Sequence, residues 1–229
     1  MPGVCVLCDR TTFNGRDLCD ECHDVLPFNG TACVRCALPL GMHRLEGGVC
    51  GACFAKPPPF ERTVTALVYR DPVPMLVRRV KFHSALVEAH ILGSLLATAV
   101  EAEYAQAALP LAIVPVPLSW RRLAGRGHNQ ATLIARPVAR RLDLPIAHEL
   151  CRRIRHTPPQ TGLSRTARQR NLAGAFEVRG RPPERIALVD DVMTTGATLR
   201  ALTRTLRRAG AHEVHLWVVA RTPGTKSGP

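Results

Sequence analysis

The sequence is poor in aromatic residues, which make up 4% of the chain. So few aromatic side chains argue against a platform on which a single-stranded nucleic acid would stack its bases. Long apolar runs are also missing: the most apolar helical stretch, Ala85 to Val100, contains Glu88 and His90 and is too short and polar to span a bilayer. The first residues lack the apolar core of a secretory signal. We therefore expect a cytoplasmic protein with no membrane span.

Lysine is scarce as well, since only Lys56, Lys81 and Lys226 occur, and arginine carries nearly all of the positive charge. The formal net charge of +13 is unevenly distributed. Residues 1–60 hold five Lys/Arg and six Asp/Glu, whereas residues 61–229 hold 26 and 12. An arginine-rich domain suits phosphate ligands, including nucleic-acid backbones. The codon bias of a GC-rich genome is an equally good explanation for many surface arginines.

Cysteine, in contrast, is concentrated: eight of the nine cysteines form four Cys-x-x-Cys pairs before residue 54. Two such pairs supply the four thiolates of a tetrahedral zinc site, so four pairs predict two structural zinc ions. Pairing can be sequential or cross-braced, with the first pair joining the third. Sequential pairing places one ion on Cys5, Cys8, Cys19 and Cys22, and the other on Cys33, Cys36, Cys50 and Cys53.

The alternative of a redox protein fits less well, because a thioredoxin-like centre needs one such motif rather than four. All-cysteine zinc sites are closed and leave no position for catalysis. The cysteine-rich segment also has little apolar sequence, so we expect it to fold only with metal bound.

The proline-rich segment Lys56 to Phe60 marks a boundary. We predict a double zinc ribbon over residues 1–56, an α/β domain over 57–222 and a disordered tail over 223–229. Apolar runs in the α/β domain predict strands at 63–69, 111–114, around 146, at 186–189 and at 213–220. Periodic patterns predict helices at 71–82, 84–108, from about 131 to 142 with an interruption near Pro137, and at 199–209.

The stretch Ile186 to Leu199 carries the strongest functional signal. An apolar strand precedes Asp190 and Asp191, and threonines surround Gly196 before a helix begins. A strand, a tight loop and a helix N-terminus form a phosphate cradle, because the first helical amides point at whatever lies above the loop. The loop lacks the Gly-Lys-Ser/Thr of a Walker A motif. Two carboxylates suit a sugar diol, so the pattern predicts a sugar phosphate ligand.

This stretch resembles the phosphoribosyl pyrophosphate (PRPP) motif of type I phosphoribosyltransferases. The whole chain further resembles the ComF family of DNA uptake proteins. The match rests on the zinc ribbon, on Val80-Lys81-Phe82, on Val114 to Ser119 followed by Arg126-Gly127-His128-Asn129-Gln130, and on Gln160 to Asn171. His128 departs from the family, where we expect an aromatic residue, usually phenylalanine.

The resemblance implies a type I phosphoribosyltransferase fold and a set of residue roles. Asp190 and Asp191 become the catalytic pair that holds the ribose hydroxyls. The 5′-phosphate would lie in the cradle, and Mg²⁺ would enter with PRPP. The pyrophosphate would contact Lys81, Ser119 and Arg126, of which Arg126, between glycines, is expected to be mobile and exposed. The cradle residues are Thr194, Thr195, Gly196, Ala197 and Thr198.

The irregular segment 152–171 holds the place of the flexible loop that closes on PRPP, and a disordered basic surface loop is its alternative reading. Two functions remain open. One is transfer of phosphoribosyl to an unknown acceptor. The other is a non-catalytic PRPP-binding adaptor that contacts single-stranded DNA through its basic C-terminal domain and competence proteins through its zinc ribbons. Purine synthesis from glutamine is not expected, because no glutamine amidotransferase domain or N-terminal cysteine nucleophile is present.

Overall fold

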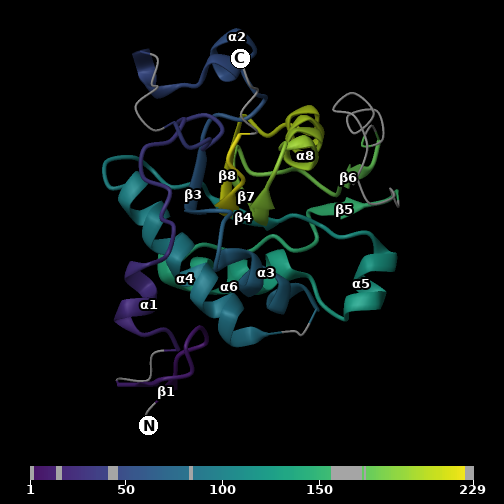
Figure 1. Cartoon of the computed structure of the whole chain (residues 1–229). Coiled ribbons are helices and arrows are strands. Elements are labelled where there is room, and N and C mark those ends of the chain that lie inside the picture. The colour runs from purple at the N-terminus through teal and green to yellow at the C-terminus, as the bar shows by residue number, and fades with distance from the viewer. Residues whose placement is uncertain are drawn as a thin grey trace.

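The computed structural model describes residues 3–13, 17–40, 46–82, 85–155, 172 and 174–224. Its centre is a four-stranded parallel sheet with the order β3-β8-β7-β4 (Figure 1). The strands are β3 (Thr63–Val68), β4 (Ala112–Pro115), β7 (Arg185–Met193) and β8 (Glu213–Arg221). All four were expected, but β7 does not end before the acids. It continues through both of them to Met193 because its pairing with β8 extends to Arg221.

Helices cover both faces of the sheet (Figure 1). They are α3 (Val73–Phe82), α4 (Leu86–Glu103), α6 (Gln130–Leu142) and α8 (Ala197–Arg208). A further short helix, α5 (Trp120–Arg126), has no buried residue. Two expectations were wrong in detail. Helix α4 ends at Glu103 rather than near residue 108, and α6 runs through Pro137 without interruption.

Side chains of the central strands alternate between two apolar clusters. Ala187 and Val189 of β7 pack in the cluster that contains α3, α4 and α6, whereas Ile186 and Leu188 pack in the cluster that contains α8. Successive strand residues point to opposite faces, and here both faces are buried. This is why β7 reads as a continuous apolar run rather than an alternating one.

The contact between α4 and α6 depends on a glycine. A Cβ atom placed on Gly93 would lie 2.6 Å from the carbonyl oxygen of Ile134 and would clash with the ring of Pro137. The proline expected to break α6 therefore fills the space that Gly93 leaves open. Close helix packing accounts for both residues.

A small two-stranded sheet was not anticipated. Strands β5 (Cys151–Arg153) and β6 (Phe176–Val178) pair antiparallel, and a bridge from Ser119 to Arg153 joins them to the loop after β4. The strand expected around residue 146 is a single bridge between Ile113 and Ile146. Among the described helices, none has both the length and the apolar character needed to cross a membrane.

The cysteine-rich part consists of two modules that pack on opposite faces of the sheet. Cys5 and Leu18 join the cluster of α3 and α4, whereas Cys33 and Cys53 join the cluster of α8. In Figure 1, β1 and α1 accordingly lie at the other end of the molecule from α2. The elements of these modules are β1 (Gly3–Val4), β2 (Thr11–Thr12), α1 (Asp20–Asp24), η1 (Glu46–Gly48) and α2 (Gly51–Ala55).

The link between the modules runs along the edge of the sheet. The backbone amide of Asn29 donates to the carbonyl of Ala66 at 2.9 Å, and the backbone amide of Val68 donates to the carbonyl of Pro27 at 2.7 Å. Phe28 forms an antiparallel bridge with Leu67. The link thus covers the exposed backbone of edge strand β3, which would otherwise be open to pairing with another chain.

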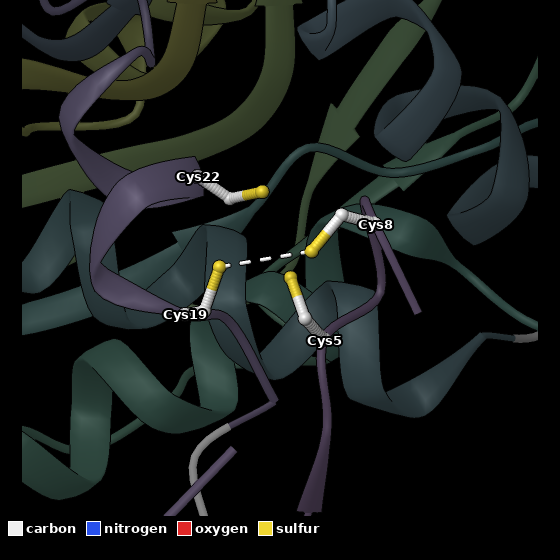
Figure 2. A group of neighbouring side chains, drawn as sticks. All are labelled: Cys5, Cys8, Cys19 and Cys22. Atoms are coloured by element: carbon white, nitrogen blue, oxygen red, sulfur yellow. Dashed lines mark hydrogen bonds between the residues drawn. The ribbon is translucent and has the colours of Figure 1, made fainter. Parts of the chain in front are cut away.

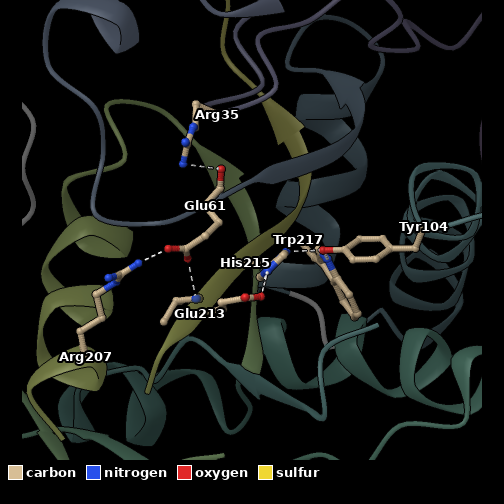
Figure 3. A network of polar contacts seen from close by, with 8 residues as sticks. Arg35, Glu61, Tyr104, Arg207, Glu213, His215 and Trp217 are labelled. Atoms are coloured by element: carbon tan, nitrogen blue, oxygen red, sulfur yellow. Dashed lines mark hydrogen bonds and ion pairs between the residues drawn. The ribbon is translucent and has the colours of Figure 1, made fainter. Parts of the chain in front are cut away.

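Glu61 links the module that contains Cys33 and Cys53 to the α/β core (Figure 3). Its carboxylate accepts the amide of Val214 at 2.7 Å and pairs with Arg207, while its carbonyl accepts from Arg35 at 3.0 Å. The bonds of Glu61 hold the segment before β3 against α8 and β8. The residue after Val214 on β8, His215, contacts the hydroxyl of Tyr104 (Figure 3).

Candidate functional site

The carboxyl ends of β4 and β7 bring two predicted loops together. The strands are neighbours, Pro115 lies opposite Val189, and the amide of Val116 donates to the carbonyl of Val189 at 2.9 Å. The loop of residues 116–119 therefore lies beside the Asp-Asp-Thr-Thr-Gly loop. Ligands of open parallel sheets bind at this edge.

The loop of residues 194–198, which we call the phosphate loop, has the backbone of an anion cradle. Gly196 has a φ of +71° and caps α8, and a Cβ atom there would lie 2.6 Å from the Cε of Met193. Only glycine fits this position without displacing Met193. Thr194 and Thr195 are exposed, and a small cavity of about 50 Å³ is lined by residues from Asp190 to Leu199. The first amides of α8 have no acceptor within the helix, so they suit an anion.

The two acids have different surroundings. Asp191 is buried and pairs with Lys81, whose Nζ lies 2.7 Å from its Oδ2. Asp190 is half-buried. Burial first, and the adjacent Asp191 second, raise the pKa of Asp190 above the ordinary carboxyl range. Each carboxylate also accepts an amide, since Asp190 Oδ1 accepts from Asp191 at 2.9 Å and Asp191 Oδ1 accepts from Val192 at 2.7 Å.

Arg126 differs from the expectation of a mobile, exposed ligand. It is half-buried at the end of α5, donates to Oε1 of Gln130 at 3.0 Å and stacks over the ring of Phe82. Burial lowers the pKa of Arg126, and the charge of Asp191 opposes that shift. Ser119, which is buried, occupies the N-cap position of the same helix without a capping hydrogen bond from its side chain. The structure thus brings Lys81, Ser119 and Arg126 toward the acids, on fixed elements rather than on a flexible turn.

The contacts of His128 account for a histidine at the position where the family was expected to have phenylalanine. Its Nε2 lies 2.6 Å from the carbonyl of Val80, and its Nδ1 lies 2.9 Å from the carbonyl of Arg126. The ring therefore lies between the end of α3, which carries Lys81, and the end of α5, and a neutral imidazole donates its single N–H to one of the two carbonyls. A phenyl ring could fill this space but could not bond to either carbonyl.

Both cysteine groups have the geometry of a zinc site. The four sulfurs of each group lie within 4.8 Å of one another (Figure 2 shows the first group). Cys8 Sγ and Cys19 Sγ are 3.7 Å apart, and Cys36 Sγ and Cys50 Sγ are 3.8 Å apart. A tetrahedron with zinc–sulfur bonds of about 2.3 Å has edges of about 3.8 Å. The residues fit two structural zinc ions.

The pairing is sequential, and the cross-braced alternative is wrong. Cys5, Cys8, Cys19 and Cys22 form the first group, and Cys33, Cys36, Cys50 and Cys53 form the second. Cys151 belongs to neither group, and burial raises the pKa of its thiol to about 12.

Two arginines near the site, Arg153 and Arg221, were not among the site residues predicted from the sequence. Arg153 on β5 is close enough to Asp190 for the two charges to interact, although burial is the main reason that the pKa of Arg153 is lowered. Arg221 ends β8 and contacts the start of the phosphate loop. A possible signal for Arg221 was a charged residue directly after the apolar run 214–220. Most of the predicted flap, residues 156–171, lies outside the described residues. Most of the predicted tail does so too.

Comparisons with known proteins agree with this architecture. Residues 1–61 match the double zinc ribbon domain model, and residues 129–228 match the phosphoribosyl transferase domain model. Competence protein F of Haemophilus influenzae is 38% identical over 178 residues, which cover 75% of this chain and 78% of that protein. DNA utilization protein YhgH of Escherichia coli K12 is 36% identical over 97% of this chain and 98% of its own length. Competence protein ComFC of Bacillus subtilis is 37% identical over 43% of this chain and 39% of its own length.

Proposed function

We propose a PRPP-dependent role in DNA uptake for this chain, which belongs to the ComF family of competence and DNA utilization proteins and has a type I phosphoribosyltransferase fold. The proposed activity is transfer of the phosphoribosyl group of PRPP to an acceptor that is not yet identified. The observation that carries the proposal is the phosphate loop, where Gly196 at φ +71° begins α8 directly beyond two acids.

Each part of PRPP has a proposed partner in this site. The 5′-phosphate accepts hydrogen bonds from the amides and hydroxyls of Thr194 to Thr198, and the ribose hydroxyls donate to Asp190 and Asp191. Lys81, Ser119 and Arg126 face the pyrophosphate, and Arg153 joins them from β5. Mg²⁺ bound with PRPP would neutralise part of the pyrophosphate charge.

The proposed reaction is substitution at C1 of the ribose. The bond between C1 and the pyrophosphate oxygen breaks, pyrophosphate leaves with the electron pair, and the acceptor forms a new bond to C1. The basic side chains stabilise the charge that develops on the leaving group, and the acids fix the sugar. Positioning and electrostatics account for the whole contribution of the named residues.

Sugar discrimination tests the assignment of the acids. Ribose 5-phosphate and 2-deoxyribose 5-phosphate share the phosphate but differ in the diol. Wild type is expected to bind the ribose compound more tightly, and an Asp190→Asn/Asp191→Asn variant should lose that preference. Equal affinity of wild type for both compounds would refute the diol assignment. Pyrophosphate release in an acceptor screen then tests transfer.

One groove supports a second candidate function, the binding of single-stranded DNA. It has a volume of about 630 Å³, and its walls come from α5, α6 and β5. Trp120 lies on its rim with 66% of its surface exposed, and Arg136, Arg152 and Arg153 line it. An exposed indole beside arginines suits a base and its phosphates. In this reading the chain is an adaptor that handles incoming DNA in the cytoplasm, and its zinc modules contact competence proteins.

Fluorescence of tryptophan separates the two functions, because the sequence has only two tryptophans and Trp217 is fully buried. Quenching by a short oligodeoxynucleotide would therefore report on Trp120. The adaptor function predicts quenching that weakens steeply with salt and disappears in Trp120→Leu. Unchanged fluorescence, with no DNA bound, would leave the transferase as the function of this site.

A further inference from the structure

The second cysteine group and the phosphate loop share one buried side chain. Arg221 is the last residue of β8, and only 9% of its surface is exposed. Its Nε donates to the carbonyl of Cys36 at 3.0 Å. Its Nη1 lies 3.0 Å from the carbonyl of Met193 and 2.6 Å from that of Thr194. One guanidinium thus joins a zinc-binding turn to the last residue of β7 and to the first residue of the phosphate loop.

The charge of Arg221 also needs the zinc site. The guanidinium of Arg221 is buried beside the second cysteine group, where its Nε contacts Cys36. A buried cation is costly unless an opposite charge compensates it. A zinc ion with four thiolates carries a net charge of −2, so the loaded site supplies that compensation.

We propose that the second zinc site holds the phosphate loop in its binding conformation, with Arg221 as the positioning residue. Zinc fixes the carbonyl of Cys36 and stabilises the guanidinium, which in turn fixes the carbonyls of Met193 and Thr194. Loss of zinc from this site removes both supports. The module that holds the second zinc site is then a structural part of the ligand site as well as a ribbon of its own.

The first cysteine group provides a matched control within the same chain. It packs on the other face of the sheet, where Arg79 of α3 donates to the carbonyl of Val6 at 2.9 Å. Its cysteines are less buried than those of the second group. A general effect of losing zinc would appear at either site, whereas the proposed coupling belongs to the second site alone.

Hydrogen exchange of the amides of residues 194–198 tests the proposal without any ligand. Exchange is compared in zinc-loaded wild type, in Cys50→Ser/Cys53→Ser and in Cys19→Ser/Cys22→Ser, together with global unfolding of each. We expect at least about fivefold faster exchange in the first variant and wild-type exchange in the second. Similar rates in both variants, or wild-type rates in both, would overturn the proposal.

Arg221 variants test the same link with the zinc ligands intact, so they keep the test decisive if a cysteine variant does not fold. Arg221→Met removes the donors and the charge, whereas Arg221→Lys keeps the charge and a single ammonium donor but loses the planar fork that reaches both sides. Both should speed exchange in the phosphate loop, and Arg221→Lys should retain zinc against a chelator better than Arg221→Met. Wild-type exchange in folded Arg221→Met would overturn the positioning role.

Binding supplies a reciprocal measurement that rests on the proposed function. By linkage, ribose 5-phosphate should raise the zinc affinity of the second site and not that of the first. If zinc-loaded wild type binds no ribose 5-phosphate, the proposed function fails, whereas the exchange measurement still decides the role of Arg221. If ribose 5-phosphate binds but the zinc affinity of the second site is unchanged, the coupling fails and the binding function stands.

Discussion

Lys81 and Asp191 form an ion pair, with Nζ and Oδ2 2.7 Å apart, between the last turn of α3 and the acidic part of β7. The pair links a residue proposed for the pyrophosphate to one proposed for the ribose. It compensates the charge of a buried carboxylate. A ligand with its own negative charge can then compete with Asp191 for the ammonium group.

Removal of Lys81 should weaken PRPP binding. A charge-assisted hydrogen bond contributes about 1.5–3 kcal/mol, so Lys81→Met should lower PRPP affinity by about 10- to 100-fold. The control is Arg78→Met, which makes the same change of charge at an exposed position of the same helix. Calorimetric titration with Mg²⁺–PRPP measures both. Equal losses in the two variants would show a general charge effect rather than a contact.

Binding of PRPP should release a proton from Asp190. The raised pKa means that part of the Asp190 population holds a proton above the ordinary carboxyl range, while the proposed complex needs the carboxylate. Affinity should therefore rise with pH across that interval. Titrations in buffers of different ionisation enthalpy measure the released proton, and Asp190→Asn should abolish the buffer dependence.

The same pKa predicts an effect on stability. Between the unfolded and the raised folded pKa, the folded chain binds more protons than the unfolded chain, so Asp190 makes the free energy of unfolding fall as pH rises. Asp190→Asn should remove this slope and be relatively more stable at pH 8 than at pH 5. Denaturant melts at both pH values check the sign. A variant that gains no relative stability at pH 8 would contradict the raised pKa.

Gly93→Ala should destabilise the fold by about 1–3 kcal/mol, because the added Cβ would press on Pro137 and on the backbone of Ile134. Gly125→Ala is the control, since Gly125 lies in helix α5 with open space around it. Alanine there should be neutral or stabilising. Thermal unfolding of the two variants measures the difference, and a stable Gly93→Ala variant would contradict the packing of α4 on α6.

Zinc content tests the pairing. Wild type should carry two zinc ions per chain, one on each four-cysteine group. Replacing all four cysteines of the first group by serine should leave one zinc on the second group. Cross-braced pairing would leave none, so elemental analysis of the purified variant gives opposite answers. The variant should also lose stability, because the first group packs against the core cluster of α3 and α4.

Local pattern predicted those parts of the fold that local chemistry determines. The apolar run of β7, the period of α8 and the spacing of the cysteine pairs each have a nearby physical cause, and each matches the structure. The predicted interruption at Pro137 failed because the cause is distant: Gly93, on another helix, accommodates the proline. The extension of β7 to Met193 likewise depends on pairing with β8.

The candidate site likewise has residues that one stretch of sequence reveals and residues that only the fold brings together. The acids and the glycine of the phosphate loop were evident from one stretch, whereas Arg153 and Arg221 come from strands distant in sequence. Arg126 seemed mobile because glycines flank it, but Gln130 and Phe82 hold it in place. Spacing revealed the zinc ligands but not that the two modules pack on opposite faces of the sheet.

The most direct test of the central claim is calorimetric titration of zinc-loaded protein with Mg²⁺–PRPP, with wild type and Asp190→Asn/Asp191→Asn compared at equal zinc content. The account predicts saturable binding of one PRPP per chain by wild type and loss of that binding in the variant. No binding by folded, zinc-loaded wild type would contradict the account.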